Sequence, residues 1–113
     1  MITDLTYLET MSAGNEDLMK EMIDIFIEQV NELSTEMQHH MDENNWMALS
    51  KIAHKAKSSV AIMGMNNLAA DLKQLELMAK DAKETNSYQD IVERFNTECG
   101  QAVEELKSLT NNH

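Results

Sequence analysis

The segment of residues 49–64, LSKIAHKAKSSVAIMG, carries the clearest structural pattern in the chain. Its apolar members recur every three or four positions, which is the spacing of one face of an α-helix. They are Leu49, Ala53, Ala56, Val60 and Met63. Gly64 follows them at the position where glycine commonly ends a helix. The pattern predicts a helix with one narrow buried face, and that face requires other helices to cover it.

The rest of the chain has the same helical period. The other predicted helices cover residues 4–11, 16–42, 68–82 (ending near residues 85 and 86) and 87–109. Short connections between four long helices predict an all-α, antiparallel, up-down-up-down four-helix bundle. The short helix over 4–11 is expected to cover one end of that bundle.

The last predicted helix has recognisable ends. Ser87, with Asp90 three residues later, resembles a capping box at its start. The polar residues Thr110 to His113 form a tail that we expect to fray.

Composition supports the all-helical prediction. The 113 residues include no proline, three glycines and 4% aromatic residues, whereas β-sandwiches and barrels need frequent turns and β-branched or aromatic strands. An apolar content of 42% can fill one core but not two. Residues 1–113 are therefore predicted to form a single domain.

Charge and cysteine content exclude several kinds of function. Nine basic and twenty acidic residues give a formal net charge of −11, which repels nucleic-acid phosphates and anionic lipid headgroups. Cys99 is the single cysteine, so it has no partner for an internal disulfide or a thiolate zinc site. The longest apolar run, over 60–65, is too short to cross a membrane. We expect a cytoplasmic protein without nucleic-acid or membrane partners, and the polar faces of most helices predict a monomer.

A basic stretch interrupts this acidic chain. Residues 44–70 contain no Asp or Glu but include Lys51, Lys55 and Lys57. His54 lies among these lysines, about 140° around the helix from Leu49, and should therefore point away from the core. On a helix, Lys51, Lys57 and the small residues Ser58 and Ala61 lie near it.

These surroundings suit a neutral imidazole that acts as a nucleophile toward a phosphoryl group. The ammonium of Lys57 would offset charge on the phosphoryl oxygens. Ser58 and Ala61 are small enough for a second protein to bring its reactive group within about 3 Å of His54. The site residues predicted from the sequence are therefore His54, Lys57, Ser58 and Ala61, with Lys51 and Lys55 as a basic surround.

The same segment resembles the histidine phosphotransfer (HPt) domains of multistep two-component phosphorelays. The family pattern is a His, a Lys three residues later, small residues at the next two positions, a Gly ten residues after the His, and leucines along the next helix. The residues that match are His54, Lys57, Ser58, Ser59, Gly64, Leu68, Leu72 and Leu75. Two positions depart from residues common in the family: Ser58 is small, as the pattern requires, but stands where the family often has Gly, and Glu76 stands where some members have Gln.

The resemblance implies that His54 accepts a phosphoryl group from the aspartyl phosphate of a receiver domain and passes it to another receiver aspartate. The partners would be receiver domains of response regulators and of a hybrid sensor kinase. The chain would be a carrier without autonomous kinase activity and without a cofactor or metal of its own, because Mg²⁺ belongs to the receiver. Gly64 would belong with Ser58 and Ala61 as a small residue that allows close approach.

A docking surface for the receiver is predicted around this site. Its residues would be Met47, Ser50, Met65, Ile23 and Ile27, because most of them fall outside the strict core faces of their helices.

Two alternative functions can be weighed against the carrier. A bundle that only docks or oligomerises explains the core but not the His and Lys aligned away from it. A metal site is disfavoured because Glu36 and His39 form a single Glu-x-x-His pair, whereas di-iron bundles need two. The ten methionines are better explained as core packing, as at Met22, Met37 and Met63.

Overall fold

The computed structural model describes residues 2–111. Within that range the protein is built from helices, with no strand. The elements are α1 (Thr6–Ser12), α2 (Glu16–Asp42), α3 (Trp46–Ile62), α4 (Asn66–Lys80), the 3₁₀ turn η1 (Thr85–Ser87) and α5 (Tyr88–Asn111). No helix in the described part of the chain has the length and apolar character that crossing a membrane requires.

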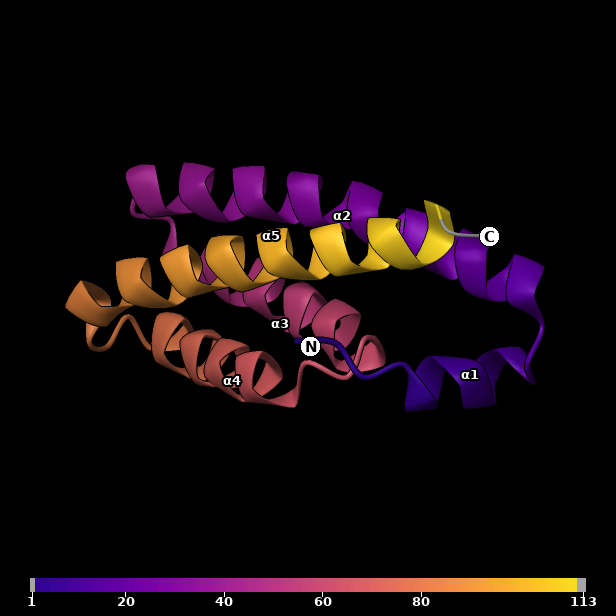
Figure 1. Ribbon diagram of the computed structural model, residues 1–113. Helices are drawn as coiled ribbons and strands as arrows, with labels where there is room; N and C mark the ends of the chain where they lie inside the picture. Colours follow the sequence, from indigo (N-terminus) through magenta and orange to yellow (C-terminus); the bar gives the residue numbers. More distant parts are fainter. Residues whose placement is uncertain (1, 112–113) are drawn as a thin grey trace.

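The four long helices form an elongated antiparallel bundle (Figure 1), and the molecule, with α1 included, measures 44 × 21 × 20 Å. Each of α2, α3 and α4 packs against a neighbour along the chain, and α5 closes the ring by packing against both α4 and α2. The short helix α1 extends from one end of the bundle and packs against α2. The predicted four-helix bundle with an additional N-terminal helix is confirmed.

The core contains the narrow face of α3 that the periodicity predicts. Leu49, Ala53, Ala56 and Val60 are fully buried. The two alanines allow close approach of a neighbouring helix, and α3 and α4 form the most extensive helix pair in the bundle. At the start of α3, the ring of Trp46 packs edge to face against the buried ring of Tyr88, with the ring centroids 5.3 Å apart. These contacts fix the side of α3 that is left for solvent.

Several helix ends differ by a few residues from the sequence prediction, and three of them have a local structural cause. Helix α4 ends at Lys80, because Ala82 adopts a left-handed conformation with φ 54°. Helix α1 begins at Thr6, after the N-cap residue Leu5, and the Thr6 backbone N–H donates to the Asp4 carboxylate at 3.0 Å. The Ser87 hydroxyl donates to the Glu84 carbonyl oxygen at 2.8 Å, and η1 precedes α5. Local backbone conformation or a local side-chain hydrogen bond is found at each of these ends, and the apolar periodicity carries no information about either.

The first two residues of the predicted frayed tail are helical in the structure. Helix α5 continues through Thr110 and Asn111. The last two residues of the predicted tail lie outside the described residues.

Gly64 ends α3 in a Schellman turn. Its φ is +74°, its N–H donates to Ala61 O, and the Met65 N–H donates to Val60 O. The N-terminal segment lies directly on this turn: the Asp4 N–H donates to Met63 O at 2.9 Å. A Cβ on Gly64 would stand 2.3 Å from the Asp4 carbonyl oxygen.

The N-terminal segment is also attached to α5. The Glu105 carboxylate accepts the backbone N–H groups of Ile2 and Thr3 at 2.8 and 3.2 Å, and the Thr3 hydroxyl at 3.0 Å. These bonds, with the contact at Gly64, place α1 beside the C-terminal end of α3.

Candidate functional site

His54 stands on the solvent side of α3, as the helical wheel predicts. Its side chain is 61% exposed, whereas Ala53 and Ala56 on either side of it in sequence are fully buried. A ring exposed to this extent is accessible to the reactive group of a second protein.

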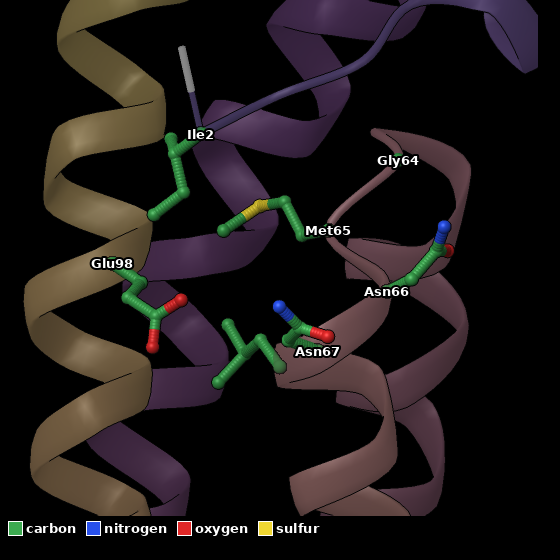
Figure 2. A pocket seen from close by; sticks show the side chains of 7 residues that line it. Ile2, Gly64, Met65, Asn66, Asn67 and Glu98 are labelled. Atoms are coloured by element: carbon green, nitrogen blue, oxygen red, sulfur yellow. The ribbon is translucent and has the colours of Figure 1, made fainter.

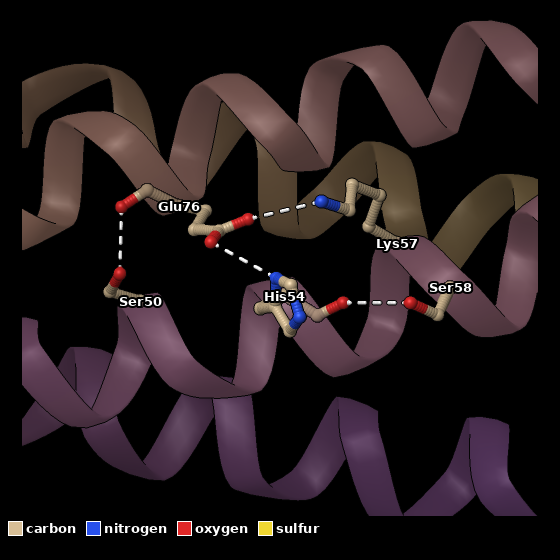
Figure 3. Close-up of polar contacts among 5 residues, drawn as sticks. All are labelled: Ser50, His54, Lys57, Ser58 and Glu76. Carbon is tan, nitrogen blue, oxygen red and sulfur yellow. Dashed lines mark hydrogen bonds and ion pairs between the residues drawn. The ribbon is translucent and has the colours of Figure 1, made fainter.

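Glu76 of α4 faces His54 and binds both of the predicted site groups (Figure 3). Its Oε2 lies 3.0 Å from His54 Nδ1, and its Oε1 lies 3.4 Å from Lys57 Nζ. The Ser50 hydroxyl donates to the Glu76 carbonyl oxygen at 2.7 Å and ties this turn of α4 to α3. The carboxylate is therefore held in place by both helices.

This contact determines which nitrogen of His54 can react. An ionised carboxylate only accepts hydrogen bonds, so Nδ1 must carry the proton that it donates to Glu76. In the neutral ring the lone pair is then on Nε2. Figure 3 shows that the ring directs one nitrogen toward Glu76 and the other away from it. The available nucleophile is Nε2.

The charge on Glu76 is maintained by the same two partners. Burial acts to raise the pKa of Glu76, but the hydrogen bond from His54 and the positive charge of Lys57 outweigh it and lower the pKa below its ordinary value. Because its pKa is lowered, Glu76 stays ionised at pH values at which an ordinary glutamate begins to be protonated. It is neutralised only as the pH falls through the lowered pKa.

Small residues border His54 on the side of the α3 C-terminus. Ser58 and Ala61 are exposed, and the Ser58 hydroxyl donates to the His54 carbonyl oxygen at 3.4 Å. Both residues line a groove of about 740 Å³ whose opposite wall is α1, with Tyr7 and Thr10. Ser58 thus contacts His54 directly, and Ser58 and Ala61 together form part of an open surface between α3 and α1.

The structure gives a different reason for a glycine at position 64 from the one predicted. It is only half-buried, but Asp4 occupies the space where its side chain would project. The absence of a side chain at Gly64 makes room for the chain's own N-terminal segment.

Three of the predicted docking residues are buried. Ile23 is 4% exposed, Met65 is 3% exposed and Ser50 is 5% exposed. Ile23 belongs to the inner face of α2, and Ser50 uses its hydroxyl to hold α4. Figure 2 shows the Met65 side chain directed from the turn after Gly64 toward Ile2, between the helices, beside a pocket of about 270 Å³.

Two of the predicted docking residues do reach the surface. Met47 is 51% exposed, and Ile27 is half-buried. On α2 the more exposed isoleucine is Ile25, at 48%.

A second groove lies on the other side of His54, toward the start of α3. It measures about 360 Å³ and is lined by Met47, Ser50, Lys51, His54, Glu76 and Lys80. Lys80 was not predicted from the sequence, although it follows Glu76 by one helical turn and so lies on nearly the same face of α4. Lys55 is exposed but does not line this groove.

The residues considered for metal binding have other surroundings. His39 pairs with Glu43 at 3.6 Å on the surface, and Cys99 is buried, which raises the pKa of its thiol to about 12. Among residues 2–111, no three His, Cys, Asp or Glu side chains are grouped to hold a metal ion.

The four-helix bundle, with the exposed His54 beside Lys57 and small residues, has the features of the histidine phosphotransfer domains that the sequence resembles. A sequence model of the Hpt domain matches residues 21–109, and the chain belongs to this family. Its role is that of a histidine phosphotransfer carrier in a phosphorelay, and proteins of this family interact with receiver domains and are carriers rather than kinases.

The fold has a close counterpart among solved structures. The crystal structure of histidine-containing phosphotransfer protein B (HptB) from Pseudomonas aeruginosa PAO1 matches with a TM-score of 0.89 and 22% sequence identity. The match covers 98% of this chain and 96% of that chain. At this identity the likeness shows a shared fold. None of the curated proteins compared with the chain matches it.

Proposed function

We propose that Nε2 of His54 accepts the phosphoryl group from the aspartyl phosphate of a receiver domain and returns it to the aspartate of another receiver. The observation that carries this proposal is the exposed ring whose Nδ1 is occupied by Glu76, which leaves Nε2 free. Its lone pair forms the N–P bond while the acyl P–O bond breaks, and the receiver aspartate leaves as a carboxylate.

Glu76 has a role in this step that follows from charge. The attacking ring keeps its proton on Nδ1, so the product is a positively charged phosphoimidazolium that faces the Glu76 carboxylate at hydrogen-bond distance. The reverse step, to a second receiver, reforms the neutral imidazole with the same proton on the same nitrogen. The chain therefore needs no proton exchange with solvent during a cycle.

Lys57 supplies the positive charge for the phosphoryl oxygens. It is one helical turn from His54, and its ammonium already lies at the site because Glu76 holds it. A partly exposed ion pair of this kind is worth roughly 0–1 kcal/mol, so a phosphoryl group can replace the carboxylate as the partner of Lys57 at little cost. We place Mg²⁺ on the receiver and no cofactor on this chain, because Glu76 is the one carboxylate that contacts His54 among the described residues.

The direct test is to incubate the purified chain with a phosphorylated receiver domain and Mg²⁺. We expect an acid-labile, base-stable phosphate that peptide mapping by mass spectrometry assigns to His54. The chain incubated with ATP and Mg²⁺ alone should remain unlabelled, as expected of a carrier without kinase activity. An acid-stable label, or a label mapped to another residue, would refute the proposal.

Removing the ammonium beside the histidine should slow the reaction. For Lys57→Ala we expect the rate of transfer from the phosphorylated receiver to fall by about tenfold to about a hundredfold, because charge on the phosphoryl oxygens is no longer offset. The measurement is a rapid-quench time course. Lys55→Ala makes the same change in charge on the same helix and should alter the rate by less than about twofold. Equal rates in the two variants would count against the role of Lys57.

Two substitutions of Glu76 should separate its charge from its hydrogen bond. In Glu76→Gln the amide oxygen can still accept the His54 proton, but the negative charge that favours the phosphoimidazolium is gone. A less positive ring is a poorer leaving group, so the phosphohistidine should live about threefold to about tenfold longer. In Glu76→Ala the ring also loses its orientation, and phosphorylation should slow by about tenfold.

The pH dependence of this effect follows from the lowered pKa of Glu76. Because wild-type Glu76 stays charged throughout the neutral range, the difference in lifetime between wild type and Glu76→Gln should persist from about pH 8 to about pH 6. Lifetimes are measured by the decay of the label. A difference that disappears within that range would show that the Glu76 charge does not set the lifetime.

A further inference from the structure

The groove between His54 and the start of α3 contains two positive charges that the proposed chemistry does not use. Lys51 comes from α3 and Lys80 from α4, so the two lysines approach the groove from different helices. The exposed side chain of Met47 and the ring of His54 also line it. The nucleophile thus borders a surface that combines cations with an apolar side chain.

Lys51 and Lys80 combine two properties: each lines the groove beside His54, and neither is neutralised by an ion pair within the described residues. In the described part of the chain, Lys57 pairs with Glu76, and Arg94 pairs with Asp71 and Glu98. Neither Lys51 nor Lys80 takes part in an ion pair within residues 2–111, although the chain carries twenty acidic residues. Glu76 lines the same groove, but both of its carboxylate oxygens are engaged by His54 and Lys57. The groove therefore offers two ammonium groups without a carboxylate of their own.

This arrangement addresses an electrostatic problem. A formal net charge of −11 repels any acidic partner at long range. The phosphorylated aspartate and the carboxylates that hold Mg²⁺ make the approaching face of a receiver acidic. Unpaired lysines beside the nucleophile attract that face and orient it over His54, since complementary charges act mainly on association rate and register.

We propose that the groove bounded by Met47, Lys51 and Lys80 receives acidic side chains of the partner receiver domain, and that these two lysines select and orient that partner. This inference rests on the proposed function of His54. It assigns Lys51 and Lys80 to docking, in contrast to Lys57, which acts on the transferred group. The contacts lie on both α3 and α4, so a receiver seated there spans the two helices that hold His54 and Glu76.

The test compares Lys51→Glu and Lys80→Glu with Lys20→Glu, which makes the same change in net charge on α2, away from this groove. At low salt we expect each groove variant to lower kcat/KM for transfer from a phosphorylated receiver by about tenfold. Added salt should reduce that loss, because it screens the attraction. Lys20→Glu should change kcat/KM by less than about twofold. Groove variants that behave like Lys20→Glu would overturn the proposal.

A small phosphoryl donor separates docking from chemistry. Phosphoramidate needs no docking surface, so its rate of phosphorylating His54 should change by less than about twofold in Lys51→Glu and Lys80→Glu. If the phosphoramidate rate fell as far as the receiver rate, the two lysines would act on the reaction itself, and the docking assignment would be wrong.

Binding can also be measured without any transfer. The Kd of His54→Gln for the unphosphorylated, Mg²⁺-loaded receiver should rise by about tenfold when Lys51→Glu or Lys80→Glu is added. An unchanged Kd would overturn the docking proposal. Failure of the wild-type chain to become phosphorylated would instead overturn the proposed function, so the two failures are distinguishable.

Discussion

Replacing His54 by Gln is expected to abolish phosphorylation of the chain by a phosphorylated receiver. The glutamine side chain is polar and of similar length, but its amide nitrogen has no available lone pair to attack phosphorus. With the only proposed nucleophile removed, the label should fall by about a thousandfold or more, to background. The measurement is the amount of acid-labile, base-stable phosphate after incubation with the receiver and Mg²⁺.

The fold should survive this substitution. His54 is 61% exposed, and exposed substitutions generally change stability by less than about 0.5 kcal/mol. Helical content and Tm are the controls for folding. His39→Gln is the matched variant, because His39 is also an exposed helical histidine that contacts a carboxylate. It should keep the full label, and a label that persisted in His54→Gln would place the phosphate elsewhere.

Replacing Gly64 by Ala is expected to cause the largest loss of stability among the three possible Gly→Ala substitutions. An alanine there must adopt φ near +74°, which costs about 1–2 kcal/mol. Its Cβ would also stand 2.3 Å from the Asp4 carbonyl oxygen and 2.6 Å from the Asp4 Cβ. The N-terminal segment must shift, and the bond from Asp4 N–H to Met63 O is strained or lost. We expect a total loss of about 2–4 kcal/mol and a fall in Tm of about 10 °C or more.

Substitutions at the other two glycines separate the cost of backbone strain from the cost of the contact with Asp4. Gly14 has a similar φ of +78° with nothing within 4 Å of the added Cβ, so Gly14→Ala should cost only the backbone strain, about 1–2 kcal/mol. Gly100 lies within α5 in open space, so Gly100→Ala should stabilise the protein by up to about 1 kcal/mol. Equal losses for Gly64→Ala and Gly14→Ala would mean that the contact with Asp4 contributes nothing.

The parts of the structure that sequence could predict are those that repeat along a helix. The face formed by Leu49, Ala53 and Val60 recurs with the helical period, and the same period places His54 on the opposite side. Both predictions hold because burial selects side chains at every turn of α3. The order and packing of the helices followed from the number and length of such segments.

Features that depend on one tertiary contact were not predictable in the same way. On α2, Ile23 and Ile25 differ by only two positions, yet one is buried and the other is half exposed, because the exact rotation of α2 against its neighbours decides between them. Met65 follows a turn whose direction is set by Gly64. In each case the residue type is compatible with either side of the helix.

The residues of the site show the same difference between periodic features and features that depend on a tertiary contact. His54, Lys57, Ser58 and Ala61 lie on one helix, so their spacing alone brings them together. Glu76 and Lys80 belong to α4, and their position beside His54 depends on how far α4 slides along α3. The bond from the Ser50 hydroxyl to the Glu76 carbonyl oxygen fixes that register. Such a bond between two helices leaves no periodic signal in the sequence.

The ion pair between Lys57 and Glu76 has a consequence for selectivity against dissolved anions. Inorganic phosphate or a nucleotide that diffuses to the histidine finds the Lys57 ammonium already paired with the Glu76 carboxylate, so a free anion gains little by binding at Lys57. A phosphoryl group delivered by a bound partner arrives at high effective concentration and can displace that carboxylate. Glu76 thus limits the binding of free phosphate at Lys57 until a receiver domain delivers the phosphoryl group.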